Sequence, residues 1–386
     1  MSKAVEEQVV KWRRELHQMP EIGNELPKTS QYVQDCLKDM GIPFVTMVNG
    51  SGVLATITGG GPGKTIALRA DMDALPLPEE ADIDFKATNG NMHACGHDAH
   101  TAMLLGAAKI LNDHRSEIKG IVKLIFQPGE EAPGGAKPMI AEGALKGVDA
   151  IFGQHIGCLF SDLKESGKII VSHSNAMACR DAFKIKIIGR GAHGAWPENS
   201  IDPISIGAQV VNGIYMIKAR EIAALDPAVI SIGMIHAGTA NNIIPMTLEI
   251  EGTTRSINPA TRKKIADRIE QVLKSTCEAH GAAYEFDFIL DYDITANNPD
   301  MADLVIKAAQ DLGCGGDIMP QPNPVMGSED MSFFLNEVPG AYFFLSSVVH
   351  QGDQVFGHHH PKFMLDETVF HKGVAVFVQL VQNYLK

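Results

Sequence analysis

The chain has 386 residues, of which 45% are hydrophobic and 20% are charged. This length and composition allow two or three domains with large cores and exclude a disordered protein. With 33 basic and 46 acidic residues, the net charge is −13. Binding to nucleic-acid backbones or to anionic membranes needs clustered positive charge. We therefore expect neither nucleic acid nor a membrane as a partner.

The N-terminus and the cysteines indicate a compartment. Residues 1–16 are charged, without the apolar centre of a signal peptide, and no run of 18 apolar residues follows. Six cysteines without a CxxC pair argue against a disulfide framework in a chain of this length. These features predict a cytoplasmic protein.

The first part of the chain alternates between strands and helices. Helical spacing predicts helices at 4–18 and 28–40, and apolar runs predict strands at 53–58 and 65–70. The glycine-rich segment 59–64 between those strands suggests a hairpin. A helix at 101–113, a strand at 121–126, a helix at 136–142 and a strand at 150–153 follow. This alternation is typical of a mostly parallel sheet with helices on both faces.

The pattern changes after about residue 180. Strands are expected at 182–189, 229–236, 246–255 and 283–289, with helices at 203–220 and 259–280. Their β-α-β-β-α-β order is the ferredoxin-like arrangement. The α/β style then returns, with helices at 299–312 and 367–385 and a strand at 341–346. We predict an α/β domain, 1–180 and 297–386, into which a smaller α+β domain, 181–296, is inserted.

Acids and histidines follow the strands of the larger domain. Asp71 and Asp73 follow one strand, Glu130 and Glu131 follow the next, and His155 follows the third. The segment HACGHDAH (93–100) opens a helix, and GHHHPKF (357–363) lies near the C-terminus. Because ligands of open α/β sheets bind outside the carboxyl ends of the strands, these groups are expected to share one site.

The residue types at that edge indicate transition metals. A thiolate, imidazoles and a carboxylate suit Zn, Mn, Co or Ni better than calcium or magnesium. A structural zinc takes four ligands, whereas five are present here: Cys95, His97, Glu131, His155 and one C-terminal histidine. Five ligands fit two ions about 3.5–4 Å apart.

The adjacent glutamates can have different roles, because neighbouring side chains point in different directions. One can bind metal while the other takes a proton from an activated water, as a general base in hydrolysis does. For Asp71, an ion pair with Arg69 is an equal alternative to a role at the site. His93 and His100 either support the site or merely flank the helix. Surface or packing positions are expected for the histidines in helical patterns: His17, His114, His280 and His371.

Several long motifs, in order along nearly the whole chain, resemble the M20 metallopeptidase family, and most closely its amidohydrolase branch. They are RRELHQMPEIGNE (13–25), RADMDALPLPE (69–79), HACGHDAHTAMLLGAA (93–108), FQPGEEAPGGAKPMI (126–140), GRGAHGAWP (189–197), GTANNIIP (238–245), EGTTR (251–255), GSED (327–330) and HHPKF (359–363).

The resemblance implies a role for each matching residue of the large domain. It implies that Cys95, His97, Glu131 and His155 bind two metal ions and that Glu130 is the acid/base. The H-x-P-x-F motif assigns the last ligand to His359, although His360 lies in the same run of histidines. Asp73 matches an aspartate that orients a ligand. Asp71 stands where other branches carry a metal-binding histidine, and a supporting role is expected.

The resemblance also implies that the inserted domain is a lid and dimerisation domain. His193 would polarise the scissile carbonyl, often across a homodimer, and Asn242 and Arg255 would hold the substrate's carboxylate. Glu198 stands where relatives often have histidine.

These expectations describe a two-metal amidohydrolase that splits N-acyl amino acids into a carboxylic acid and a free amino acid. The alternatives are a dipeptidase or carboxypeptidase of the same superfamily, and a metal-binding protein without catalysis. The presence of Glu130 and of every expected ligand speaks against the last alternative.

Overall fold

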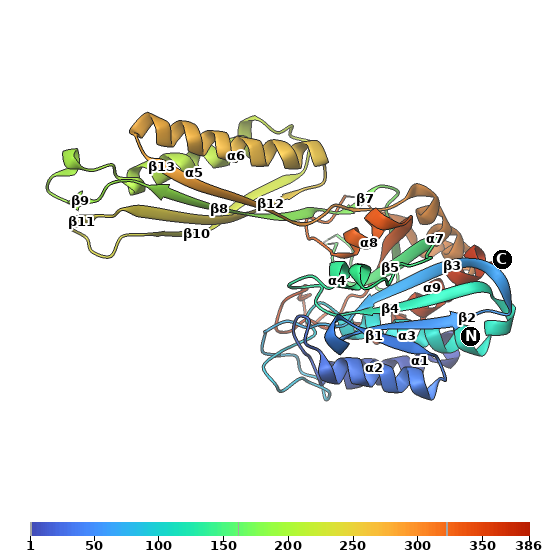
Figure 1. Cartoon of the computed structure of the whole chain (residues 1–386). Helices are drawn as coiled ribbons and strands as arrows, with labels where there is room; N and C mark the ends of the chain where they lie inside the picture. Colours follow the sequence, from blue (N-terminus) through green and yellow to red (C-terminus); the bar gives the residue numbers. More distant parts are fainter. Residues whose placement is uncertain (1, 161, 322) are drawn as a thin grey trace. The chain divides into compact units, whose positions relative to one another are not determined.

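The computed structural model describes residues 2–160, 162–321 and 323–386. Its internal contacts divide the chain into two compact units. The larger contains Met1–Ala176, Thr295–Asn323 and Asp330–Lys386, and the smaller contains Met177–Ile294 and Pro324–Glu329. The segment Pro324–Glu329 had no signal in the sequence that would assign it to the smaller unit. Figure 1 shows the elements of each unit.

The larger unit is built on a sheet in the order β1-β2-β4-β3-β5-β16-β6-β15. Its central strands β4, β3, β5 and β16 are parallel, and β1 and β2 add antiparallel strands at one side. This agrees with the expected mostly parallel α/β sheet. The strands are β1 (Phe44–Met47), β2 (Gly52–Thr58), β3 (Gly61–Asp71), β4 (Lys119–Gln127), β5 (Ala150–Gly157), β6 (Ile169–Val171), β15 (Ile318–Pro320) and β16 (Gly340–Ser346).

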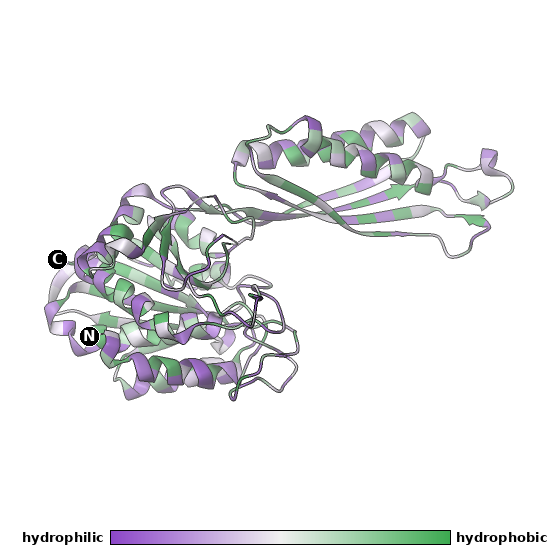
Figure 2. Ribbon diagram, turned by 180° about the vertical axis from the view of Figure 1, so that it is seen from behind, coloured by the Kyte–Doolittle hydropathy of each residue, from purple (hydrophilic) through white to green (hydrophobic). Residues whose placement is uncertain are grey.

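Helices cover this sheet. Most side chains of helix α3 are small or aliphatic, and the helix is buried along most of its length. It packs against α1, α9 and β3. Figure 2 shows hydrophobic residues concentrated along the sheet strands, as expected for strands buried on both faces. The helices are α1 (Glu6–His17), α2 (Pro27–Asp39), α3 (His97–Asp113), α4 (Ala136–Ala141), α7 (Pro299–Asp311), α8 (Met331–Glu337) and α9 (Phe370–Tyr384).

Three local predictions were wrong. The strands at 53–58 and 65–70 do not form a hairpin, because β4 lies between them and pairs with both. The glycines of the connecting segment bond to the start of β4 instead, through Gly59 N to Gly120 O and Gly60 N to Ile118 O. Helix α3 begins at His97 rather than at residue 101, and β5 continues through His155 to Gly157.

The smaller unit has the expected β-α-β-β-α-β order. Its antiparallel sheet has the order β10-β12-β8-β13 and carries α5 and α6 on one face (Figure 1). The apolar face of α5 repeats at helical spacing through Ile206, Val210, Ile214 and Ile217 and is buried against this sheet. The elements are β8 (Cys179–Ile188), α5 (Pro203–Arg220), β10 (Ala228–Ala237), β12 (Thr247–Ser256), α6 (Pro259–His280) and β13 (Ala283–Tyr292).

Four shorter strands complete the description. Strands β9 (Ala192–His193) and β11 (Ile243–Ile244) pair with each other, and β7 (Asn175–Met177) and β14 (Thr295–Ala296) lie where the chain crosses between the units. Among the described residues, no helix is both long enough and apolar enough to span a membrane.

Candidate metal centre

The predicted ligands gather at the carboxyl ends of three neighbouring strands. Asp73 follows β3, Glu130 and Glu131 follow β4, and His155 lies near the end of β5. Because β4, β3 and β5 are adjacent and parallel, their ends meet at one edge of the sheet. This is where open α/β sheets bind ligands.

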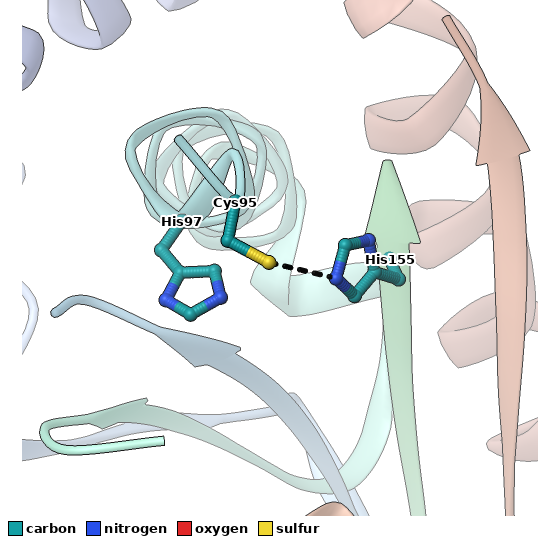
Figure 3. Close-up of side chains that lie close together, drawn as sticks. All are labelled: Cys95, His97 and His155. Carbon is teal, nitrogen blue, oxygen red and sulfur yellow. Dashed lines mark hydrogen bonds between the residues drawn. The ribbon is translucent and has the colours of Figure 1, made fainter. Parts of the chain in front are cut away.

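The start of α3 adds a thiol and an imidazole. Gly96 has a φ of +89°, which turns the backbone sharply between Cys95 and His97. The Sγ of Cys95 lies 3.5 Å from the Nε2 of His155, and His97 lies beside them (Figure 3). One ligand atom from each of these three side chains lies within 4.8 Å of the others.

The C-terminal histidine run contributes His359. Its Nε2 lies 3.0 Å from the Oε1 of Glu131. His360 instead stacks its ring on Phe356, and its Nδ1 accepts a hydrogen bond from the backbone N–H of Lys362. The structure thus brings His359, and not His360, to the other candidate ligands.

Two groups of candidate ligands share one sulfur atom. Cys95, His97 and His155 form one group, and Cys95, Glu131 and His359 form the other. Thiolate, imidazole and carboxylate donors are those that zinc and similar transition metals take. A thiolate common to both groups is able to bridge two ions.

Asp73 contacts both the backbone of the two adjacent glutamates and the ring of His97. Its Oδ1 accepts from the backbone N–H of Glu130 at 2.9 Å, and its Oδ2 accepts from that of Glu131 at 3.0 Å. The Nδ1 of His97 lies 3.2 Å from Oδ1 and 3.0 Å from the Asp73 carbonyl oxygen. The buried Nε2 of His97 has no hydrogen-bond partner among the described residues. A ring nitrogen without a hydrogen bond, on an imidazole held through its other nitrogen, fits a metal ligand.

The electrostatics of the site also fit cations. Burial lowers the pKa of His97, but Asp71, Asp73 and Glu131 outweigh it and raise the pKa to about 10. Burial, together with Glu131 and Glu130, raises the pKa of the Cys95 thiol. Without a cation this negative site therefore keeps the thiol protonated, whereas a coordinated thiol is deprotonated.

Behind the ligands lies a buried polar network. Asp71 accepts from Nη1 of Arg69 at 2.7 Å, so the ion pair expected as one alternative exists. Its Oδ1 also accepts from Nδ1 of His100 at 2.6 Å. The Nε2 of His100 accepts from the backbone N–H of Ile156 at 2.9 Å, next to His155. Because both ring nitrogens of His100 have protein partners, His100 supports β5 rather than binding metal.

Asp330 is a residue to which the sequence assigned no role. Its carboxylate accepts from Gln127 and from the backbone N–H groups of Gly135 and Ala136, and it pairs with Arg69 at 2.8 Å. Its own N–H lies 3.4 Å from the Oε1 of Glu130. Asp330 thus holds the segment that carries Glu130. The GSED motif was the only signal for it in the sequence.

The remaining predicted residues lie in the smaller unit. His193 pairs with Ile243, and the carbonyl of Asn242 accepts from the N–H of Gly194 at 2.8 Å, so His193 and Asn242 lie near each other. Arg255 lies near the opposite end of β12 and donates to Thr253 Oγ1 and to the Thr254 carbonyl. At 3.3 Å per residue, the strand separates Arg255 from the end near β11 by about 25 Å. Within one chain, the structure therefore does not bring Arg255 to His193.

Comparisons with known proteins agree with this architecture. The family described as peptidase family M20/M25/M40 matches residues 67–383. Thermostable carboxypeptidase 2 of Saccharolobus solfataricus is 43% identical, covering 99% of this chain and 96% of its own. N-acyl-L-amino acid amidohydrolase of Geobacillus stearothermophilus is 44% identical, covering 75% of this chain and 77% of its own.

A solved structure extends the comparison to three dimensions. The Bacillus subtilis protein YXEP, described as a dinuclear metal-binding peptidase of the M20 family, has a TM-score of 0.86 and 32% identity, with 99% of each chain covered. Matching motifs, a matching fold and two ligand groups at the expected sheet edge lead to one conclusion. The chain belongs to peptidase family M20/M25/M40.

Proposed function

We propose that this protein is a two-metal amidohydrolase that splits N-acyl amino acids into a carboxylic acid and a free amino acid. The observation that carries the proposal is the pair of ligand groups that share Cys95. Cys95, His97, Glu131, His155 and His359 would hold two ions of the Zn, Mn, Co or Ni class. All six cysteines are free, Cys95 among them, which fits a reducing cytoplasm.

The chain's own residues supply proton transfer and orientation. When bound, two divalent ions would supply Lewis acidity and lower the pKa of water. Glu130, buried beside Glu131 and held through Asp330, takes a proton from the attacking water and delivers it to the leaving amine. His193 donates a hydrogen bond to the oxygen that gains negative charge, and Arg255 and Asn242 bind the substrate's carboxylate.

A second copy of the chain completes this site in our proposal. His193 and Asn242 lie at one end of the smaller unit and Arg255 at the other, so one chain cannot direct all three at one substrate. Strand β10 is an edge strand and exposes Met234 and Ile235, which are 45% and 50% exposed. Such an apolar edge is suited to pairing with the same strand of a second copy. We therefore propose a homodimer through the smaller unit, with His193 and Asn242 supplied across it to the site that contains Arg255.

A carboxypeptidase is the second candidate. It is favoured by the 43% identity with a relative of that name over nearly the whole chain. Both reactions cleave an amide bond beside a free carboxylate, so the same residues would serve both.

Metal reconstitution with a substrate panel tests the proposal. Protein stripped of metal is loaded with Zn, Mn, Co or Ni and assayed on N-acetyl amino acids and on the matching dipeptides. We expect hydrolysis only after loading, and a higher kcat/KM for the N-acyl substrates. Faster cleavage of the dipeptides would favour the carboxypeptidase, and no turnover of either class with any metal would contradict both candidates.

A further inference from the structure

The motif RRELH at the end of α1 has no role in the chemistry described above, yet two of its polar side chains, those of Arg13 and His17, are almost completely buried. Arg13 and His17 are 3% and 1% exposed. They are four residues apart, so they lie on the same face of α1. The sequence had left His17 as a surface or packing residue; it is buried, and its two ring nitrogens contact the carboxylates of Asp98 and Glu79.

This face of α1 meets the start of α3. The Nε of Arg13 lies 2.9 Å from Oδ2 of Asp98, and the Nδ1 of His17 lies 2.7 Å from the same oxygen. Asp98 directly follows His97, and Cys95 precedes it by three residues. The guanidinium of Arg13 and the imidazole of His17 therefore meet on one carboxylate and fix the turn that presents both of these candidate ligands.

His17 is also linked, through Glu79 and Glu80, to the segment that carries His359. The Nε2 of His17 lies 3.0 Å from Oε1 of Glu79, whose Oε2 accepts from the backbone N–H of Ala87 at 2.7 Å. The backbone N–H of Glu80, which follows Glu79 in the chain, donates to the carbonyl of Pro361 at 2.8 Å. This links His17 to the loop that carries His359.

A second link runs through Glu367. Its carboxylate lies 3.3 Å from Nη1 of Arg13 and accepts from Nε and Nη2 of Arg14 at 3.1 and 2.6 Å. The phenyl ring of Phe85 lies against both guanidinium groups. Glu367 follows the HHPKF segment by four residues. Arg13 thus joins the start of α3 to Glu367, which directly follows the loop 357–366 that carries His359.

We infer that Arg13 and His17 are positioning residues that hold the CGH turn and the His359 loop at the spacing that two metal ions require. The backbone of His359 has a φ of +62°, a left-handed conformation that only surrounding contacts can maintain. Its N–H donates to the carbonyl of Ala94, directly before Cys95, at 2.9 Å. This bond couples the two segments, so a displacement of either one, caused by loosening its anchor, is passed on to the candidate ligand of the other.

The test compares metal affinity with stability in matched variants. Arg13→Met and His17→Gln each remove part of the network, and Glu367→Gln is a milder variant that keeps the shape of the side chain. Arg262→Met is the control, because Arg262 makes an equally close paired contact with the buried Asp181 in the smaller unit, at 2.6 and 2.8 Å. Metal-free proteins are titrated with Co²⁺ alone, following the sulfur-to-cobalt absorption band, and their unfolding midpoints are measured separately.

We expect all variants to unfold more easily, but only those of the network to bind Co²⁺ more weakly, by about 10- to 100-fold, as found for residues that orient metal ligands. The inference is overturned if Arg13→Met, His17→Gln and Glu367→Gln bind Co²⁺ as tightly as the wild type and Arg262→Met. It rests on the proposed metal centre, and the two fail differently: a wild type without the thiolate band contradicts the proposed function itself.

Discussion

The residues that follow strand ends were the ones the sequence could place. Asp73, Glu130, Glu131 and His155 follow or end central strands, and a strand end is recognisable from a local apolar run. The side chains that hold the segments of the site in place were harder to predict. The pairings of Asp330 with Gln127 and of Asp98 with Arg13 join side chains far apart in the chain, and no local pattern reveals them.

Glu130 is the residue on which the proposed chemistry depends most. Glu130→Gln keeps the shape of the side chain and an oxygen that can accept the N–H of Asp330, but it cannot take a proton. We expect kcat for an N-acyl amino acid to fall by about 10²- to 10⁴-fold, with metal content and unfolding midpoint close to those of the wild type. Steady-state kinetics on metal-loaded protein, with metal analysis of the same sample, measures this. Wild-type rates in the loaded variant would remove Glu130 from the mechanism.

The elements of the chain were predicted more reliably than their pairing. The periodicity of α5 and α6 and the alternation in β8 revealed the smaller unit because each pattern is local. The hairpin between β2 and β3 was wrong because the sequence does not show that β4 inserts between them. The early start of α3 was missed because histidines and Asp98 occupy its first turn, where the sequence shows no apolar periodicity.

Helix α1 makes stability depend on pH through His17. Burial and Arg13 lower the pKa of His17, but Asp98 and Glu79 outweigh them, so that its pKa is raised in the folded protein. A raised folded pKa contributes stability that is complete below the unfolded value of about 6.5 and is lost as pH rises through the folded pKa. We expect the difference in unfolding free energy between wild type and His17→Gln to shrink as pH rises above about 6.5.

Urea unfolding of the metal-free proteins across this pH range measures that difference. His173→Gln is the control, because His173 pairs with Asp303 on an exposed surface, where an ion pair contributes little. A difference for His17→Gln that stays constant or grows with pH would contradict a charged His17.

At the scale of the whole molecule, the proposal requires two chains for each active site. Mixing two inactive variants, Glu130→Gln and His193→Asn, tests this. In a hybrid dimer, the His193→Asn chain keeps Glu130 and receives His193 from its partner, so one of the two sites is complete. Random exchange of subunits makes half of the dimers hybrid, and we expect about a quarter of wild-type activity.

Each variant alone, treated in the same way, is the control for that mixture. Activity that stays at the level of the separate variants, although subunit exchange is demonstrated by a size or fluorescence label, would place His193 in the site of its own chain or outside catalysis.

The account depends above all on two metal ions that share Cys95, and metal content measures this directly. Wild type, Cys95→Ala and a control, Cys36→Ala, are saturated with Zn²⁺, dialysed and analysed for bound metal per chain. The account predicts two ions in the wild type and in Cys36→Ala, and the loss of both in Cys95→Ala, because removing the shared sulfur weakens both sites. A wild type that holds one ion, or a Cys95→Ala protein that still holds two, would contradict it.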